Sequence, residues 1–166
     1  MKRFVVDTNV AIVANGQCES SDDKPPAIEC RVAAVNFLID VIKSARIILD
    51  MDGEVQIEYH RYLNPRGQPG VGDRFYLEVI NSLPDKVERV ALSKRSDGEY
   101  VDLPQPLIDI SFDPSDRKFA AIAKLTGTPV VNATDSDWVN AASTLKACGI
   151  EVENLCGCDK SKWFEE

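Results

Sequence analysis

The sequence has little histidine and no long apolar run, and each shortage excludes a class of protein. His60 is the single histidine among 166 residues, so a histidine-rich zinc site is excluded. No apolar stretch approaches the roughly 18 residues of a membrane span. No glycine-rich GxGxxG or GxxxxGK[ST] motif follows a strand-like segment, which argues against the common phosphate-binding loops. Asp7 interrupts the first apolar run, so we expect no signal peptide and a cytoplasmic protein without membrane contact.

Cysteine is present in an odd number and without a metal-binding pattern. The five cysteines stand at positions 18, 30, 148, 156 and 158, and no zinc-type CxxC spacing repeats among them. Cys156 and Cys158 alone do not make a structural zinc site. For a cytoplasmic protein we expect these cysteines to be reduced and free of metal.

The formal net charge of −8 argues against a duplex-binding protein, because such binding needs clustered lysine and arginine. It is compatible with a cluster of carboxylates that holds divalent cations, since the ions would neutralise part of the charge. The negative net charge is also compatible with a positively charged binding partner.

Short apolar runs alternate with segments of helical periodicity along the whole chain. Strands are predicted over 3–7, 46–50, 87–92, 129–132 and 150–155, and helices over 27–45, 54–63, 74–82, 113–126 and 138–148. This alternation predicts one three-layer α/β/α domain over 1–166 with a largely parallel sheet. Residues 64–112 fit this plan least well and are interpreted as a longer insert, which begins with a flexible loop near the site over 64–73. Residues 15–26 are interpreted as a loop.

Three aspartates follow predicted strands at the edge where ligands collect in open α/β sheets. Asp7 ends the first strand, and Asp135 and Asp137 follow the fourth. Each has a structural alternative, an Asx turn for Asp7 and turn or N-cap chemistry for the other two. Asn9 is expected to hold its loop by hydrogen bonds.

Helical periodicity selects two further acids. Val55, Tyr59, Tyr62 and Leu63 form an apolar stripe with Glu58 at its edge, whereas Glu54 falls on the solvent side.

Asp116 shares a helix face with Phe119, Ala120 and Ala123, which places its carboxylate on the buried side of the later helix. The alternative is a capping box in which Asp113 is the N-cap. On the first helix, the same reasoning predicts that Val32, Val35, Ile39 and Ile42 face the sheet.

Several carboxylates at one edge would repel one another unless divalent cations lay among them. Oxygen ligands favour Mg²⁺ or Mn²⁺ over zinc. The combination therefore predicts a carboxylate metal site rather than a set of unrelated caps.

With these motifs in order, the chain resembles the PIN-domain family of nucleases. The resemblance spans nearly the whole chain and rests on four segments, Val5–Asn9, Gln56–Tyr59, Asp113–Phe119 and Val130–Asp137. It implies Mg²⁺- or Mn²⁺-dependent cleavage of RNA, often single-stranded. In this interpretation Asp7 anchors one or two ions and Glu58, Asp116 and Asp135 complete the site. Asp137 contacts an ion or a residue that binds one. Glu54 or Glu29 are alternatives for the second acid.

The resemblance also implies partners. Many family members are toxins held inactive by an antitoxin, so it implies an RNA substrate, an antitoxin-like or other regulatory protein and a homodimer. The long segment 64–112 argues against a compact toxin. Candidate phosphate contacts are Arg61, Arg66, Arg74, Lys94 and Arg95, with solvated surface charge as the alternative.

Two rival functions stay open. One is a phosphatase with Asp7 as the aspartyl nucleophile. Such enzymes usually have a second aspartate two residues later as acid and base, and this chain has Asn9 there. A PIN-like module that binds RNA or protein without cutting fits the acidic composition and the long segment.

Overall fold

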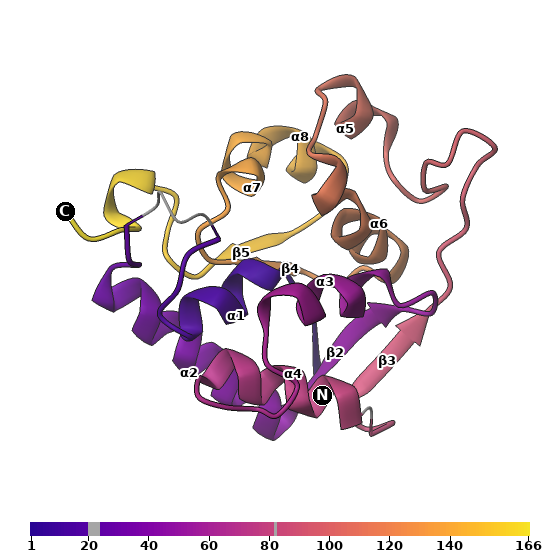
Figure 1. The fold of residues 1–166 in the computed structure, drawn as a ribbon. Helices are drawn as coiled ribbons and strands as arrows, with labels where there is room; N and C mark the ends of the chain where they lie inside the picture. The colour runs from indigo at the N-terminus through magenta and orange to yellow at the C-terminus, as the bar shows by residue number, and fades with distance from the viewer. Residues whose placement is uncertain (20–23, 82) are drawn as a thin grey trace.

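The central sheet of the computed structural model, which describes residues 1–19, 24–81 and 83–166, has five parallel strands. In spatial order they are β3 (Val87–Val90), β2 (Ala45–Asp50), β1 (Lys2–Val6), β4 (Val130–Asn132) and β5 (Val152–Asn154) (Figure 1). Phe4 of β1 lies opposite Ile47 of β2, and Val5 lies opposite Val130 of β4. Both faces of a parallel sheet are covered by helices, which is why the inner strands β1, β2 and β4 contain short continuous apolar runs.

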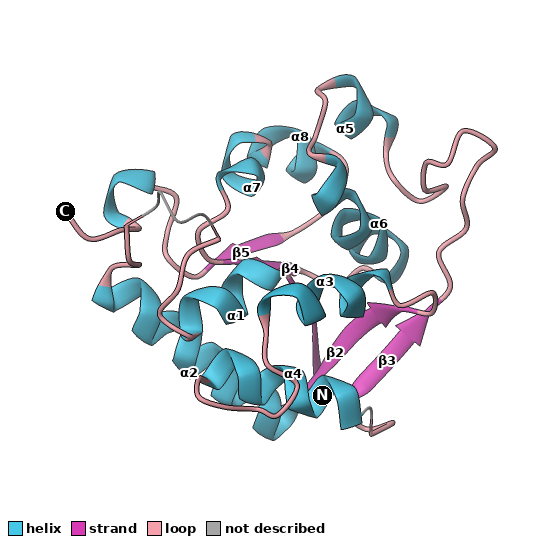
Figure 2. Ribbon diagram, in the orientation of Figure 1, coloured by secondary structure: helices cyan, strands magenta, loops and turns pink. Residues whose placement is uncertain are grey.

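Helices cover the sheet in two groups (Figure 2). One group contains α1 (Thr8–Ala14), α2 (Ile28–Ser44) and α4 (Val71–Asn81), and the other contains α5 (Gln105–Asp109), α6 (Arg117–Thr126), α7 (Ser136–Asn140) and α8 (Ala142–Ala147). A further helix, α3 (Glu54–Tyr62), contacts α1 and α6 and so joins the two groups. The predicted three-layer α/β/α architecture is confirmed. No helix in the described ranges is long and apolar enough to cross a membrane.

The buried face of α2 differs from the predicted one. Its fully buried side chains are Cys30, Ala34, Leu38 and Val41, whereas Val32 is 50% exposed. The periodicity was ambiguous because apolar residues occur on several sides of this helix. Cys30 and Ala34 are small, and small side chains let α2 approach α1, with which it packs.

Helix α1 lies where the sequence predicted a turn and an unassigned stretch. All seven of its residues are buried, so its sequence has no polar face and no helical periodicity to detect. The predicted loop over 15–26 includes residues 20–23, which lie outside the described residues, as does the last residue of the predicted helix over 74–82.

Segment 64–112 is partly built into the domain. Helix α4 packs on α1 and α2, and β3 extends the sheet beside β2. The stretch 64–73 was predicted to be flexible and near the acidic residues. Instead, Asp73 accepts hydrogen bonds from the backbone N–H groups of Asn64 and Gly70 and from the side chain of Asn15, just beyond the far end of α1.

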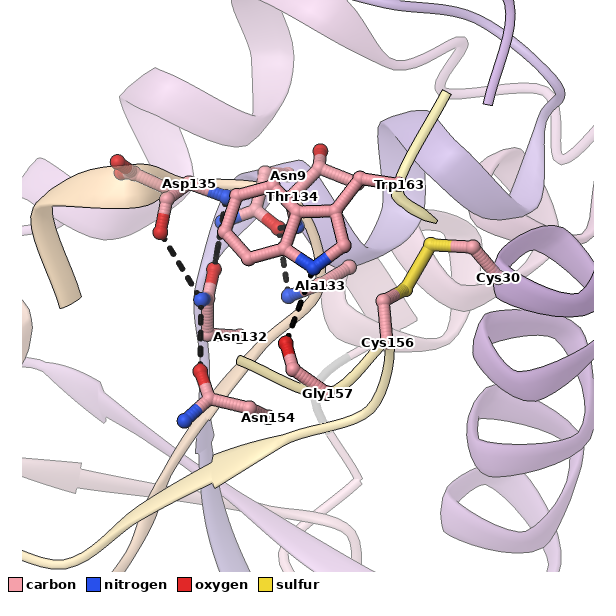
Figure 3. The surroundings of a disulfide bond; sticks show 10 residues. All are labelled: Asn9, Cys30, Asn132, Ala133, Thr134, Asp135, Asn154, Cys156, Gly157 and Trp163. Carbon is pink, nitrogen blue, oxygen red and sulfur yellow. Dashed lines mark hydrogen bonds between the residues drawn. A yellow bond between two sulfur atoms is a disulfide. The ribbon is translucent and has the colours of Figure 1, made fainter. Parts of the chain in front are cut away.

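A disulfide joins Cys30 at the start of α2 to Cys156 after β5 (Figure 3). The expectation that all five cysteines are reduced is wrong for this pair. No local pattern indicates this bond, because 126 positions separate the two residues and only the fold brings them together. Cys148 and Cys158 are free thiols.

Candidate metal centre

The acidic residues gather where the order of strands in the sheet reverses direction. From β1 the chain builds β2 and β3 on one side, and then β4 and β5 on the other. Asp7 follows β1 and Asp135 comes three residues after β4. Ligands of open α/β sheets bind at the carboxyl ends of strands at such a reversal.

Asp7 is buried, with 3% of its surface exposed, and its two oxygens have different partners. Its Oδ1 accepts the backbone N–H of Asn9 at 3.1 Å, which makes Asp7 the N-cap of α1. Its Oδ2 accepts the indole N–H of Trp138 at 2.5 Å. The predicted turn chemistry is therefore present, and it fixes the direction in which the carboxylate points.

A chain of amide side chains places Asp135 (Figure 3). Asn9 Oδ1 accepts the backbone N–H groups of Ala133 and Thr134 at 2.8 and 2.9 Å, as expected of a residue that holds a loop. Asn132 Oδ1 accepts from the backbone N–H of Asp135 at 3.0 Å and from the side chain of Asn9 at 3.0 Å. Asp135 Oδ1 in turn caps α7 by accepting the N–H of Asp137 at 2.9 Å.

Asp116 reaches the same place from the start of α6. It ends a short 3₁₀ turn, η1 (Pro114–Asp116), whose N-cap is Asp113, as predicted. Asp116 itself makes no capping bond at the start of α6. It is only 5% exposed, and its Oδ2 has no hydrogen-bond partner among the described residues. The capping alternative therefore accounts for Asp113 and not for Asp116, whose side chain lies within hydrogen-bonding reach of Asp135 and Asp137.

Asp7, Asp116 and Asp135 each offer a carboxylate oxygen within 4.8 Å of the others, and we call these three residues the acidic triad. Burial, with the charge of Asp135 next in size, raises the pKa of Asp7 to about 7. Burial also raises the pKa of Asp135 to about 6. The pKa of Asp116 lies well above its usual range because of burial and then the charges of Asp7 and Asp135. Three ionised carboxylates are thus unfavourable here without a positive charge among them.

The donor set suits a hard divalent cation. Every member of the acidic triad offers oxygen, and an unpartnered buried oxygen on Asp116 is the kind of atom that a metal ion satisfies. A second group, formed by Asp113, Asp116 and Asp137, shares Asp116 with the first. The predicted Asp137 therefore lies beside the triad and outside it.

Glu58 lies near the triad but is engaged elsewhere. Thr8 Oγ1 donates a hydrogen bond to its Oε2, and Lys118 Nζ forms an ion pair with its Oε1 at 2.9 Å. Its charge contributes to the raised pKa of Asp7, so it is close to that residue. Glu54 is bound by Lys94 and Tyr100 and belongs to neither group, as its place on the helix predicted.

Two residues at the site had not been predicted. Lys118 is buried and donates to Glu58 and, at 2.5 Å, to the carbonyl of Ser115. Trp138 is fully buried and binds Asp7. Neither had a local signal, because their partners are 60 and 131 positions away.

The five basic candidates differ in their surroundings. Arg74, Lys94 and Arg95 form ion pairs with Glu78, Glu54 and Asp97. Among the described residues no ion pair involves Arg61 or Arg66.

No protein-family model and no curated protein sequence matches this chain. The resemblance to PIN-domain nucleases therefore rests on the four sequence segments alone.

Proposed function

We propose that the protein is a Mg²⁺- or Mn²⁺-dependent endoribonuclease whose metal is held by the acidic triad. The observation that carries the proposal is the convergence of Asp7, Asp116 and Asp135 at the strand reversal, with the unpartnered buried oxygen of Asp116 among them. Structural caps explain one oxygen each on Asp7 and Asp135. They do not explain why three carboxylates with raised pKa values are buried together.

Each side chain has a role set by its contacts. Asp7 is held by Asn9 and Trp138, and Asp135 by the N–H of Asp137, so both present carboxylate oxygens in fixed directions. Asp116 supplies its Oδ2, which has no hydrogen-bond partner in the part of the chain that the structure describes. When bound, the ion lowers the pKa of a water molecule and stabilises charge on the phosphate and the leaving oxygen. No nucleophilic side chain is required.

RNA as the substrate, a regulatory protein partner and a homodimer come from the resemblance and stay predictions. The phosphatase alternative is disfavoured at the position where such an enzyme has its second aspartate. That position is Asn9 here, and its side chain forms hydrogen bonds with residues 132–134. The binding-module rival predicts the same fold without turnover, so only an activity measurement separates it from the enzyme.

The test is cleavage of an end-labelled single-stranded RNA with Mn²⁺ and with EDTA. Wild type is compared with Asp116→Asn, which keeps the shape of the side chain and removes its charge. Asp159→Asn is the matched control, because Asp159 caps the 3₁₀ turn η2 (Lys160–Lys162) by accepting the N–H of Ser161, away from the triad. We expect Mn²⁺-dependent cutting by wild type and Asp159→Asn and its loss in Asp116→Asn. Cutting that survives in Asp116→Asn contradicts the proposal, and no cutting by wild type favours the binding module.

A further inference from the structure

A hollow of about 370 Å³ lies beside α3, next to the acidic triad. Three of its lining residues connect it to the site. Ser115 precedes Asp116, Glu58 is bonded to Thr8, the neighbour of Asp7, and Lys118 is bonded to both Glu58 and Ser115. The rest of the wall is formed by apolar Ile57, aromatic Tyr100, basic Arg61 and acidic Glu54.

The charges in this hollow are balanced except for one. Lys118 pairs with Glu58, and Lys94 and Tyr100 bind Glu54. Arg61 is left as a guanidinium without an ion pair among the described residues. In a chain of net charge −8, an unpaired cation that lines a hollow beside an acidic site favours an anionic ligand there.

A second hollow of about 570 Å³ continues over α3 on the other side of Arg61. It shares Ile57 and Arg61 with the first hollow, and Met51, His60 and Tyr76 also line it. Arg61 and Ile57 therefore stand between two adjoining depressions. The side chain of Ile57 is 56% exposed and that of Met51 is 64% exposed. Tyr76 is buried and Tyr100 is half-buried, so the accessible apolar surface beside Arg61 comes from Ile57 and Met51. A basic group that can follow the phosphate backbone is one feature of surfaces that bind single-stranded nucleic acid.

We propose that the hollow beside the triad binds the nucleotide next to the cleaved bond of a single-stranded RNA. Arg61 contacts its phosphate, and Ile57 and Tyr100 contact its base or sugar. The strand then continues over Ile57 into the second hollow. This inference rests on the proposed function and adds to it a substrate path and a residue that positions the strand.

The inference is tested by measuring RNA binding apart from cleavage. Every protein carries Asp116→Asn so that the labelled RNA stays intact, and fluorescence anisotropy is recorded in Mn²⁺ at several salt concentrations. Arg61→Ala is compared with Arg31→Ala, which removes an exposed arginine that also has no ion pair among the described residues and lines neither hollow. We expect Arg61→Ala to weaken binding roughly three- to tenfold and Arg31→Ala to leave it nearly unchanged.

The salt dependence gives a second measure. Loss of one phosphate contact should reduce the slope of log K against log salt by about 0.7 for a single strand. Equal affinities and equal slopes for Arg61→Ala and Arg31→Ala overturn the inference even when wild type cleaves RNA. A wild type that cleaves nothing while Arg61→Ala still weakens RNA binding overturns the nuclease proposal and leaves the subsite supported. No measurable RNA binding by the parent protein overturns the subsite.

Discussion

Asp135→Asn should stabilise the metal-free protein, although it changes a residue of the proposed site. Asp135 has a pKa raised from 3.8 to about 6, chiefly by burial. Each pKa unit corresponds to about 1.4 kcal/mol, so the ionised carboxylate costs at most about 3 kcal/mol in the folded protein, and about half of that after allowance for solvent screening. Asparagine removes the charge, and its Oδ1 can still accept the N–H of Asp137.

The size of this stabilisation depends on pH. Because the folded state holds the proton more tightly than the unfolded chain, wild-type stability falls as the pH rises from about 4 to about 6 and stays lower above that. The advantage of Asp135→Asn should be near zero at pH 4 and reach about 1.5–3 kcal/mol at pH 8, which corresponds to roughly 3–10 °C in Tm for a chain of this length.

Thermal unfolding in EDTA at pH 4, 6 and 8 measures this difference. Asp159→Asn is again the control, because Asp159 makes the same type of capping bond but has a lowered pKa, owing first to its hydrogen bonds from Ser161. It should give no gain at pH 8. In Mn²⁺ at a hundred times its Kd, wild type should gain about 2.7 kcal/mol, and Asp135→Asn should lose most of this gain. A destabilised Asp135→Asn at pH 8, or an effect independent of pH, would refute the reasoning.

Three further predictions follow from the same contacts. The Mn²⁺-induced rise in Tm should be larger at pH 8 than at pH 5, because Asp7 and Asp135, with pKa values of about 7 and 6, must lose their protons to bind the ion; a rise independent of pH would contradict this. Lys118→Met should leave the largely buried Glu58 without its ion pair and lower the free energy of unfolding, measured in urea melts, by about 2 kcal/mol. It should also tighten Mn²⁺ binding, because the Glu58 carboxylate is freed. Weaker Mn²⁺ binding would show instead that Lys118 supports the site. Cys30→Ser should lower the free energy of unfolding by about 5 kcal/mol, because the disulfide closes a loop over 126 positions; the difference from wild type should vanish in dithiothreitol.

The parts of the site that the sequence could predict are those set by strand ends and helix periodicity. Asp7 and Asp135 follow short apolar strands, and Asp116 shares a face with Phe119 and Ala120, so their convergence needed only the rule for parallel sheets. The structure brings these three together. Glu58 was predicted at the edge of the apolar stripe of its helix, and its side chain is 16% exposed, although Tyr62 of that stripe is 45% exposed.

What the sequence could not predict depends on pairs of residues far apart in the chain. The Lys118–Glu58 ion pair, the Trp138–Asp7 hydrogen bond and the disulfide each join positions separated by 60 or more residues. Helix α1 was missed because all of its residues are buried. A helical period of apolar and polar residues appears in the sequence only when one side of the helix is exposed to solvent. The face of α2 was mistaken for the opposite reason, since it carries apolar residues on more than one side.

Calorimetric titration of Mn²⁺ into wild type and Asp116→Asn at pH 8 tests the central claim most directly. If the acidic triad is a metal centre, wild type should bind the ion saturably, Asp159→Asn should match it, and Asp116→Asn should bind at least tenfold more weakly, roughly the effect of losing one charged ligand oxygen. Equal affinities in Asp116→Asn and wild type, or no saturable heat in wild type, would contradict the account.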